Sequence, residues 1–410
     1  MKMKLSKICA ALPMALLLTF GVLSAPANAY AKDKQTDFPV VVLQKTGNDA
    51  NRNVWLFVGD GYTKEQQEKF LQDVRARVDK ILLIEPYKSY KDALNIYAIE
   101  AVSKESGVSR AADKGKNNAK LRDTYLCVHN NSVGLERLGW FFPEGEKHLN
   151  HLIKQLEQNY LDKGGRVMQT SVLSNSNIYF GGGALNYAVA SLAAGEAMVV
   201  HEASHGFANL ADEYNGNPQE GPNKTKQTDL KKVPWREFFG FRNVELFKYG
   251  NGAQKPVRGG CLMNSLYAQH GYCEVCKEHV AEILNKGLKA EGRPYYMAQP
   301  SLTLHEKEQM KTGKAVTSIM LPEANGQRLQ LRTVVRSFTD AEQLFTLHLT
   351  VRDKEMRVKY SAEKAVRVAS RALKSLALVT AELKNFAAGD VVSWYICEGE
   401  NRRIVSKNVE

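Results

Sequence analysis

Several features that the sequence lacks narrow the classes of protein to which it can belong. Beyond residue 29 it has no apolar run near the ~20 residues that a membrane helix needs. It has no internal repeat and no low-complexity tract. Lys and Arg outnumber Asp and Glu by 56 to 44, but no basic stripe interleaved with aromatics is present. We therefore expect neither a membrane span nor a nucleic-acid partner.

The first 29 residues have the features of a secretory signal peptide. Lysines precede an apolar stretch from Ile8 to Leu23, and Ala27-Asn28-Ala29 has the A-x-A form of a cleavage site. We therefore expect residues 1–29 to be removed and the remaining chain to be periplasmic or extracellular.

Cysteine is scarce, with six residues in 410. Five follow the predicted cleavage site, an odd number that leaves at least one thiol without an intrachain partner. Export permits disulfides, and we favour a stabilising disulfide. The alternative is a structural zinc ion held by three thiols, with His270 or His279 as a fourth ligand. The five cysteines are Cys127, Cys261, Cys273, Cys276 and Cys397.

The pattern of apolar residues changes near residue 290. Before it, predicted strands and helices alternate, which favours an α/β (α+β) domain over residues 30–290. After it, apolar and polar residues alternate in short runs, which favours a small β-sandwich over residues 291–410. The segment 365–386 fits a strand or a helix. Expected strands in the first part include 38–43, 54–58, 93–101, 167–173 and 177–180, with helices from 63 and over 146–159.

The motif His201-Glu202-Ala203-Ser204-His205 matches the H-E-x-x-H pattern of zinc peptidases. On a helix, residues four apart share a face, so His201 and His205 can bind one Zn²⁺ ion together. Glu202 lies on the neighbouring face, where it can act as general base. A buried helix with two incidental histidines is the alternative, and the acidic cluster that follows favours a metal.

A catalytic zinc needs a third protein ligand. In metzincins a glycine three residues after the second histidine turns the chain, and the ligand follows three residues later. Those positions hold Ala208 and Ala211 here, and neither can serve. Asn209 tolerates a left-handed backbone. We therefore predict a turn at Asn209 and Asp212 as the ligand, with Glu213 facing away and free to orient a histidine.

Other residues are expected to support the site. Met263 follows the motif where a methionine turn would lie beneath the metal, and Tyr267 or Tyr214 could steady an oxyanion. Gly181, Gly182 and Gly183 suit a strand edge where an extended substrate pairs, or else a flexible loop. The aromatic run from Trp235 to Phe239 is expected to line the substrate cleft.

Several stretches together carry a family resemblance. They are 57–63, 106–108, 181–183, 201–214, and 261–263 with the C-x-x-C at 273–276. With these the sequence resembles the bacterial IgA peptidase family of secreted zinc metallopeptidases over roughly residues 40–285. The resemblance implies a metzincin-like catalytic domain and endopeptidase activity. It does not imply that IgA is the substrate.

The sequence thus predicts a zinc-dependent endopeptidase that acts on proteins or peptides, with Glu202 as general base. A zinc amidase that acts on cell-wall peptides is one alternative. A catalytically inactive binding module on the same fold is another, disfavoured because Glu202 is present. The oligomeric state is left open.

Overall fold

The computed structural model describes residues 36–214, 219–249, 252–267, 271–304, 328–384, 387 and 389–408. The predicted signal peptide and His270 lie outside these residues. Within the described ranges, no helix has the length and apolar character needed to cross a bilayer.

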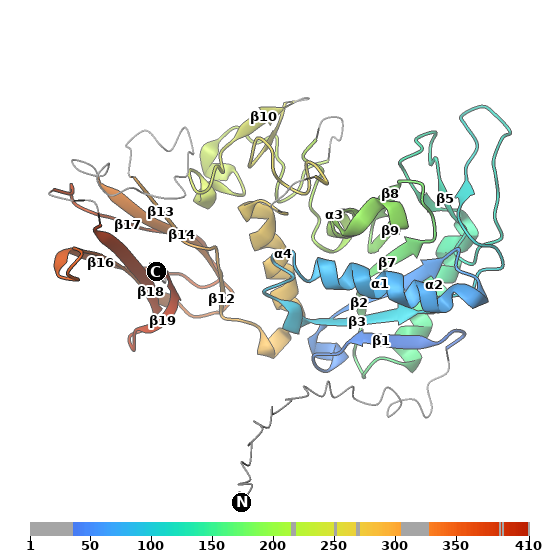
Figure 1. The fold of residues 1–410 in the computed structure, drawn as a ribbon, viewed down its shortest axis with the longest axis horizontal. Helices are drawn as coiled ribbons and strands as arrows, with labels where there is room; N and C mark the ends of the chain where they lie inside the picture. Colours follow the sequence, from blue (N-terminus) through green and yellow to red (C-terminus); the bar gives the residue numbers. More distant parts are fainter. Residues whose placement is uncertain are drawn as a thin grey trace, which may run out of the picture. The chain divides into compact units, whose positions relative to one another are not determined.

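A six-stranded mixed sheet organises residues 40–191, and Figure 1 shows it at the right. Its strand order is β1-β3-β2-β7-β9-β8. The β3-β2, β2-β7 and β7-β9 pairs are parallel, whereas both edge pairs, β1-β3 and β9-β8, are antiparallel. The strands are β1 (Val40–Gln44), β2 (Asn53–Asp60), β3 (Leu94–Ile99), β7 (Val167–Ser174), β8 (Gly181–Ala184) and β9 (Tyr187–Ser191).

Strand β2 is buried along its whole length, as its continuous apolar run predicts. Trp55 and Phe57 pack into one hydrophobic core, and Val54 and Leu56 pack into another. Because successive strand residues point to opposite faces, both faces of the sheet are covered.

In the part of the chain that the structure describes, four α-helices flank the sheet or follow it. Apolar residues of α1, α3 and α4 belong to the core of Trp55, whereas those of α2 belong to the opposite core. The predicted capping box at the start of α1 is confirmed: Thr63 N donates to Gln66 Oε1 at 3.1 Å. The helices are α1 (Gln67–Ile81), α2 (Pro143–Asn159), α3 (Gly195–Phe207) and α4 (Glu274–Gly287).

Short elements connect these parts. The strand predicted over 177–180 is wrong: these residues are irregular, and pairing begins at Gly181. Short strands are β4 (Ser109–Arg110), β5 (Val128–Asn130), β6 (Trp140–Phe141), β10 (Phe247–Tyr249) and β11 (Ala253–Lys255). The 3-10 helices are Asp49–Asn51, Lys64–Gln66, Lys91–Ala93, Leu192–Ala194, Leu230–Lys232, Arg236–Phe238 and Lys289–Glu291.

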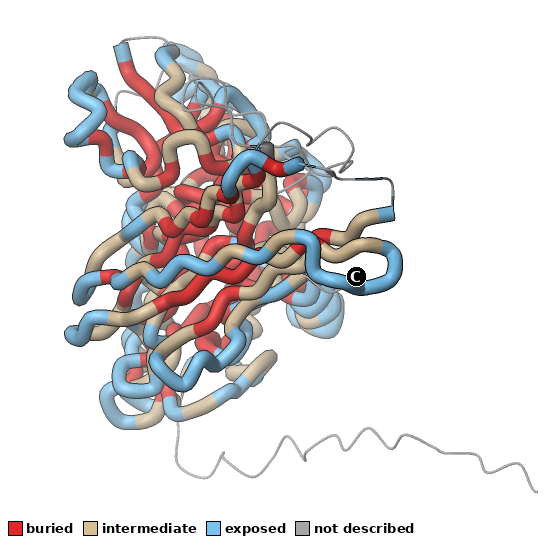
Figure 2. Tube along the Cα trace, turned by 90° about the vertical axis from the view of Figure 1, so that its left-hand side faces the viewer, coloured by how far each residue is buried: buried red, intermediate tan, exposed pale blue. Residues whose placement is uncertain are grey.

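The described residues after 294 form two four-stranded antiparallel sheets. Both sheets contribute side chains to one core, as in a sandwich. The central strands β14 (Leu329–Ser337) and β15 (Gln343–Arg352) are mostly buried, whereas β16 (Val358–Val368) is largely exposed, and Figure 2 shows both buried and exposed strand segments on this side of the molecule. In the ambiguous segment 365–386, residues 365–368 end one strand, residues 369–372 form a turn, and residues 373–379 form the next strand. The strands are β12 (Tyr295–Met297), β13 (Ser301–Leu304), β14 (Leu329–Ser337), β15 (Gln343–Arg352), β16 (Val358–Val368), β17 (Leu373–Val379), β18 (Val391–Glu398) and β19 (Arg403–Lys407).

Strand β14 also contacts the residues before 290. Arg336 Nε lies 2.6 Å from the buried Glu278 carboxylate of α4. Arg332 donates to the main-chain oxygens of Glu237 and Phe239, at 3.1 and 2.7 Å. Val334 belongs to the same core as Trp55. A domain boundary at 290/291 stays a prediction.

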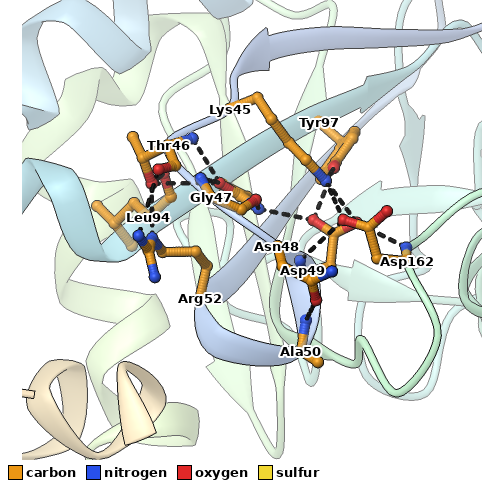
Figure 3. A network of polar contacts seen from close by, with 11 residues as sticks. Lys45, Thr46, Gly47, Asn48, Asp49, Ala50, Arg52, Leu94, Tyr97 and Asp162 are labelled. Atoms are coloured by element: carbon orange, nitrogen blue, oxygen red, sulfur yellow. Dashed lines mark hydrogen bonds and ion pairs between the residues drawn. The ribbon is translucent and has the colours of Figure 1, made fainter. Parts of the chain in front are cut away.

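A buried carboxylate ties together the ends of three segments around the sheet (Figure 3). Asp49 accepts hydrogen bonds from Asn95 Nδ2 and Tyr97 OH, both at 2.7 Å, and from Asp162 N at 2.8 Å. Lys45 Nζ lies 2.7 Å from the same carboxylate. With these partners Asp49 holds the β1–β2 connection against β3.

Candidate metal centre

The three side chains predicted as metal ligands lie close together, two on the C-terminal half of α3 and one on the loop that follows it. His201 Nε2 lies 3.2 Å from Asp212 Oδ1, and His205 Nε2 lies 3.3 Å from the same oxygen. The three ligand atoms all lie within 4.8 Å of one another. His201 and Asp212 are buried, and His205 is mostly buried. The helix and the returning loop therefore form a candidate metal site.

The other ring nitrogens fix the tautomer of both histidines. His201 Nδ1 lies 3.0 Å from the Leu262 main-chain oxygen, and His205 Nδ1 lies 2.7 Å from that of Leu210. A carbonyl oxygen only accepts, so each Nδ1 carries a hydrogen and a neutral ring presents a lone pair at Nε2. Two lone pairs then face a carboxylate oxygen. Such an arrangement is stable only with a positive charge between them, either a proton or a metal ion.

The distances also fit a tetrahedral ion. With Zn–N of about 2.05 Å and Zn–O of about 2.0 Å, two ligand atoms at neighbouring corners of the coordination tetrahedron lie about 3.3 Å apart. The two histidine-to-Asp212 distances match that edge. Without an ion, burial would lower the pKa of His205, but contact with the Asp212 carboxylate raises this pKa to about 8. Asp212 in turn has its pKa lowered by both rings, against the effect of burial.

Glu202 borders this site without joining it. Its Oε2 lies 4.0 Å from His205 Nε2, and its side chain is mostly buried. Burial raises the pKa of Glu202 above its ordinary value, while the neighbouring His201 and His205 oppose that rise. A carboxylate in this position can accept a proton close to the candidate ion.

The turn predicted after the motif is confirmed, because Asn209 has a φ of 50°. Asn223 holds the next residues: its Oδ1 accepts from Ala211 N and its Nδ2 donates to Ala211 O, both at 2.8 Å. Lys224 Nζ donates to the Asp212 main-chain oxygen at 3.0 Å. These contacts keep the returning loop, and with it Asp212, close to α3.

The three glycines lie in the edge strand β8, so the flexible-loop alternative is wrong. At Gly181 the outer edge already pairs, since Gly181 N donates to Arg137 O at 3.1 Å. A Cβ at Gly183 would lie 2.4 Å from Glu202 O, and one at Gly182 would lie 2.2 Å from Gly139 O. These glycines therefore permit the close approach of neighbouring backbones, and substrate pairing here stays a prediction.

The remaining support residues differ in position. Met263 is fully buried and its main-chain oxygen accepts from Glu213 N at 2.8 Å. Tyr214 stacks against His201, with ring centroids 6.5 Å apart, whereas Tyr267 is 87% exposed. The expectation that residues 235–239 line a cleft is wrong for its largest side chains. Trp235 and Phe238 are buried in the core.

The five cysteines are all free thiols, so the disulfide that the sequence favours is wrong. Cys261, Cys273 and Cys276 instead gather around Glu213. As expected, Glu213 lies outside the group of His201, His205 and Asp212, but its carboxylate contacts Asn223 and Cys276 rather than orienting a histidine. The sequence suggested the three thiols as possible zinc ligands but not Glu213, which lies nearly fifty residues before Cys261.

Comparison with known proteins now identifies the family. The family model IgA Peptidase M64 matches residues 41–249, just over half of the chain. No curated protein matches.

Among solved structures, OgpA from Akkermansia muciniphila is 10% identical, with 93% of this chain and 96% of that chain covered and a TM-score of 0.25. Beta-glucuronidase 2 from Bacteroides uniformis is 7% identical, with a TM-score of 0.20. The alignment covers 27% of this chain and only 12% of that enzyme. Scores this low support no conclusion about fold or function. The family match covers β1 through β10 and includes His201, Glu202, His205 and Asp212, and the chain belongs to the IgA peptidase M64 family.

Proposed function

We propose that this peptidase is a zinc-dependent endopeptidase that is exported and hydrolyses peptide bonds in proteins or peptides. Its zinc ion would be held by His201, His205 and Asp212. The observation that carries the proposal is the convergence of two Nε2 lone pairs on one carboxylate oxygen at tetrahedral-edge distances. Export rests on the sequence of residues 1–29.

When bound, zinc supplies Lewis-acid chemistry: it polarises a carbonyl group and makes water more acidic. Glu202 takes a proton from the attacking water and gives it to the leaving amine nitrogen. Its burial favours this role, because a raised pKa brings the carboxylate closer to the pKa of the groups with which it exchanges protons.

The neighbouring residues position these groups. The Leu262 and Leu210 carbonyls orient the two rings through Nδ1. Tyr214 is better placed than the exposed Tyr267 to donate to a developing oxyanion, because its ring stacks on His201.

The test is hydrolysis of casein by Glu202→Gln. We expect activity to fall at least ~1,000-fold, on the scale of the general acid–base and electrostatic contributions that this carboxylate makes, while zinc content stays at the wild-type level. Glu196→Gln is the matched control. Glu196 lies on the same helix but pairs with Arg77 at 3.3 Å, and this variant should keep full activity.

Wild-type turnover by Glu202→Gln would contradict the assignment of the base. Peptidoglycan fragments form the second arm of the assay. Their cleavage without that of casein would identify a cell-wall amidase, and no cleavage of either would favour a binding module.

A further inference from the structure

We propose that Glu213, Cys261, Cys273 and Cys276 form a second metal site that takes a structural zinc ion. One carboxylate oxygen and three thiol sulfurs lie within 4.8 Å of one another, and all four residues are buried. Thiolate and carboxylate are both zinc ligands, and four protein ligands that leave no open position are typical of structural sites. This inference does not depend on the proposed peptidase mechanism.

The spacing of the ligand atoms fits one tetrahedral ion. With Zn–S of about 2.3 Å, two sulfurs on one zinc lie about 3.8 Å apart, and a sulfur and an oxygen lie about 3.5 Å apart. Cys261 Sγ and Cys276 Sγ are separated by 3.7 Å, and Cys276 Sγ and Glu213 Oε1 by 3.4 Å. A disulfide between two of these cysteines would instead bring their sulfurs to about 2.05 Å from each other.

The Glu213 carboxylate needs a positive partner. Its side chain is fully buried, and among the described residues Oε2 has no hydrogen-bond partner. Oε1 accepts from Asn223 Nδ2 at 3.0 Å, which is a neutral group. A buried carboxylate is costly unless it is paired or coordinates a metal. An ion between Glu213 and the thiols meets that need.

Nearby charges offset those of the ligands. Lys255 Nζ donates to the Glu213 main-chain oxygen and Lys224 Nζ to that of Asp212, each at 3.0 Å, and both lysines are buried. Three thiolates and one carboxylate carry four negative charges, which a divalent ion and these two lysines balance. A disulfide between two of the thiols would remove the ligands but leave the Glu213 carboxylate and a third thiol buried.

The site would join two segments that build the first metal centre to the start of α4. Glu213 follows Asp212 directly, and its N donates to Met263 O at 2.8 Å. Cys261 precedes Leu262, whose carbonyl orients His201. Cys273 and Cys276 lie at the start of α4. The second ion would therefore fix the loop of Asp212 against the segment that orients His201.

The first test is elemental analysis of the purified chain after expression with zinc. We expect two equivalents of zinc in the wild type, and one in Cys276→Ser and in a His201→Ala/His205→Ala variant. Cys127→Ser is the control, because Cys127 lies outside the cluster, and it should keep two. If only the catalytic proposal fails, the wild type has one equivalent, which the histidine variant keeps and Cys276→Ser loses. The second site is overturned if the wild type has one equivalent that Cys276→Ser keeps and the histidine variant loses.

The second test needs no cysteine variant and covers the case in which Cys276→Ser does not fold. Cobalt(II) is loaded into the wild type and into the histidine variant. Thiolate ligands give cobalt an intense charge-transfer absorption in the near ultraviolet, and we expect it in both proteins. A reagent for free thiols should count five cysteines in the mature chain after denaturation with chelator. A count of three, or no charge-transfer band, overturns the proposal.

Discussion

Gly206 lies on α3, the helix of the candidate metal site, next to His205, and its replacement by alanine tests how tightly that helix packs. A Cβ at Gly206 would lie 1.5 Å from the Leu185 main-chain oxygen, whereas real contacts of this kind stay beyond 3.0 Å. Helix α3 and the β8–β9 turn would have to separate by roughly 1.5 Å. The obstacle is backbone, so a side-chain rotation cannot relieve it.

Two effects of opposite sign decide the result. Alanine in a helix interior is favoured over glycine by about 1 kcal/mol. Overpacking costs typically about 1–3 kcal/mol, and we expect about 3 here because a main-chain atom must move. The net prediction is a loss of about 2 kcal/mol in the free energy of unfolding. Because a displacement of ~1 Å near a reacting centre can cost ~100-fold, kcat/KM on casein should fall by about that factor.

The stability is measured by urea denaturation in the presence of chelator, which removes the contribution of bound metal. The matched control is Gly259→Ala, since a Cβ at Gly259 meets nothing within 4 Å. The control should match the wild type in stability and activity. If Gly206→Ala is as stable as the wild type or more so, helix propensity wins and the close packing of α3 is refuted.

Three further outcomes are expected. Asp49→Ala should lower the free energy of unfolding, measured by urea denaturation, by about 3 kcal/mol, because it leaves Asn95 and Tyr97 without their buried acceptor. The control Asp123→Ala breaks only an exposed ion pair and should lower it by less than ~1 kcal/mol. Burial raises the pKa of Asp60 to about 6, so the folded protein binds this proton more tightly than the unfolded chain. The contribution of Asp60 to stability is then complete below about pH 4 and is lost by about pH 6, so the free energy of unfolding should fall by about 3 kcal/mol over this range. Asp60→Asn should remove this fall. If the free energy of unfolding of the variant and of the wild type changes with pH in parallel, the reasoning is contradicted. Chelation of the wild type should abolish casein hydrolysis and added zinc should restore it, and activity that persists in chelator would contradict a metal requirement.

Local sequence signals predicted the main structural elements of the candidate site. The H-E-x-x-H spacing placed both histidines on α3, and the left-handed tolerance of asparagine placed the turn at Asn209, where φ is 50°. Asp212 lies beside both rings as predicted from that turn. These features depend on residues within a dozen positions of one another, where backbone geometry leaves few alternatives.

Features that depend on distant contacts were not predictable. The partners of Glu213 come from Cys261 and from the start of α4, and nothing within the local sequence relates them. Residues 177–180 have strand-like composition but lie before β8: Phe180 O accepts from Ser191 N at 3.1 Å, and the strand itself begins at Gly181. The burial of Trp235 is likewise set by tertiary packing, since aromatic composition suits a cleft and a core equally.

The most direct test of the central claim is an anomalous difference map collected at the zinc absorption edge from crystals of the mature protein. We predict a peak bonded to His201 Nε2, His205 Nε2 and an Asp212 carboxylate oxygen, with Glu202 near it but outside the ligand set. A map from zinc-supplemented protein without a peak at these three atoms, or with Glu202 as a ligand in place of Asp212, would contradict the account.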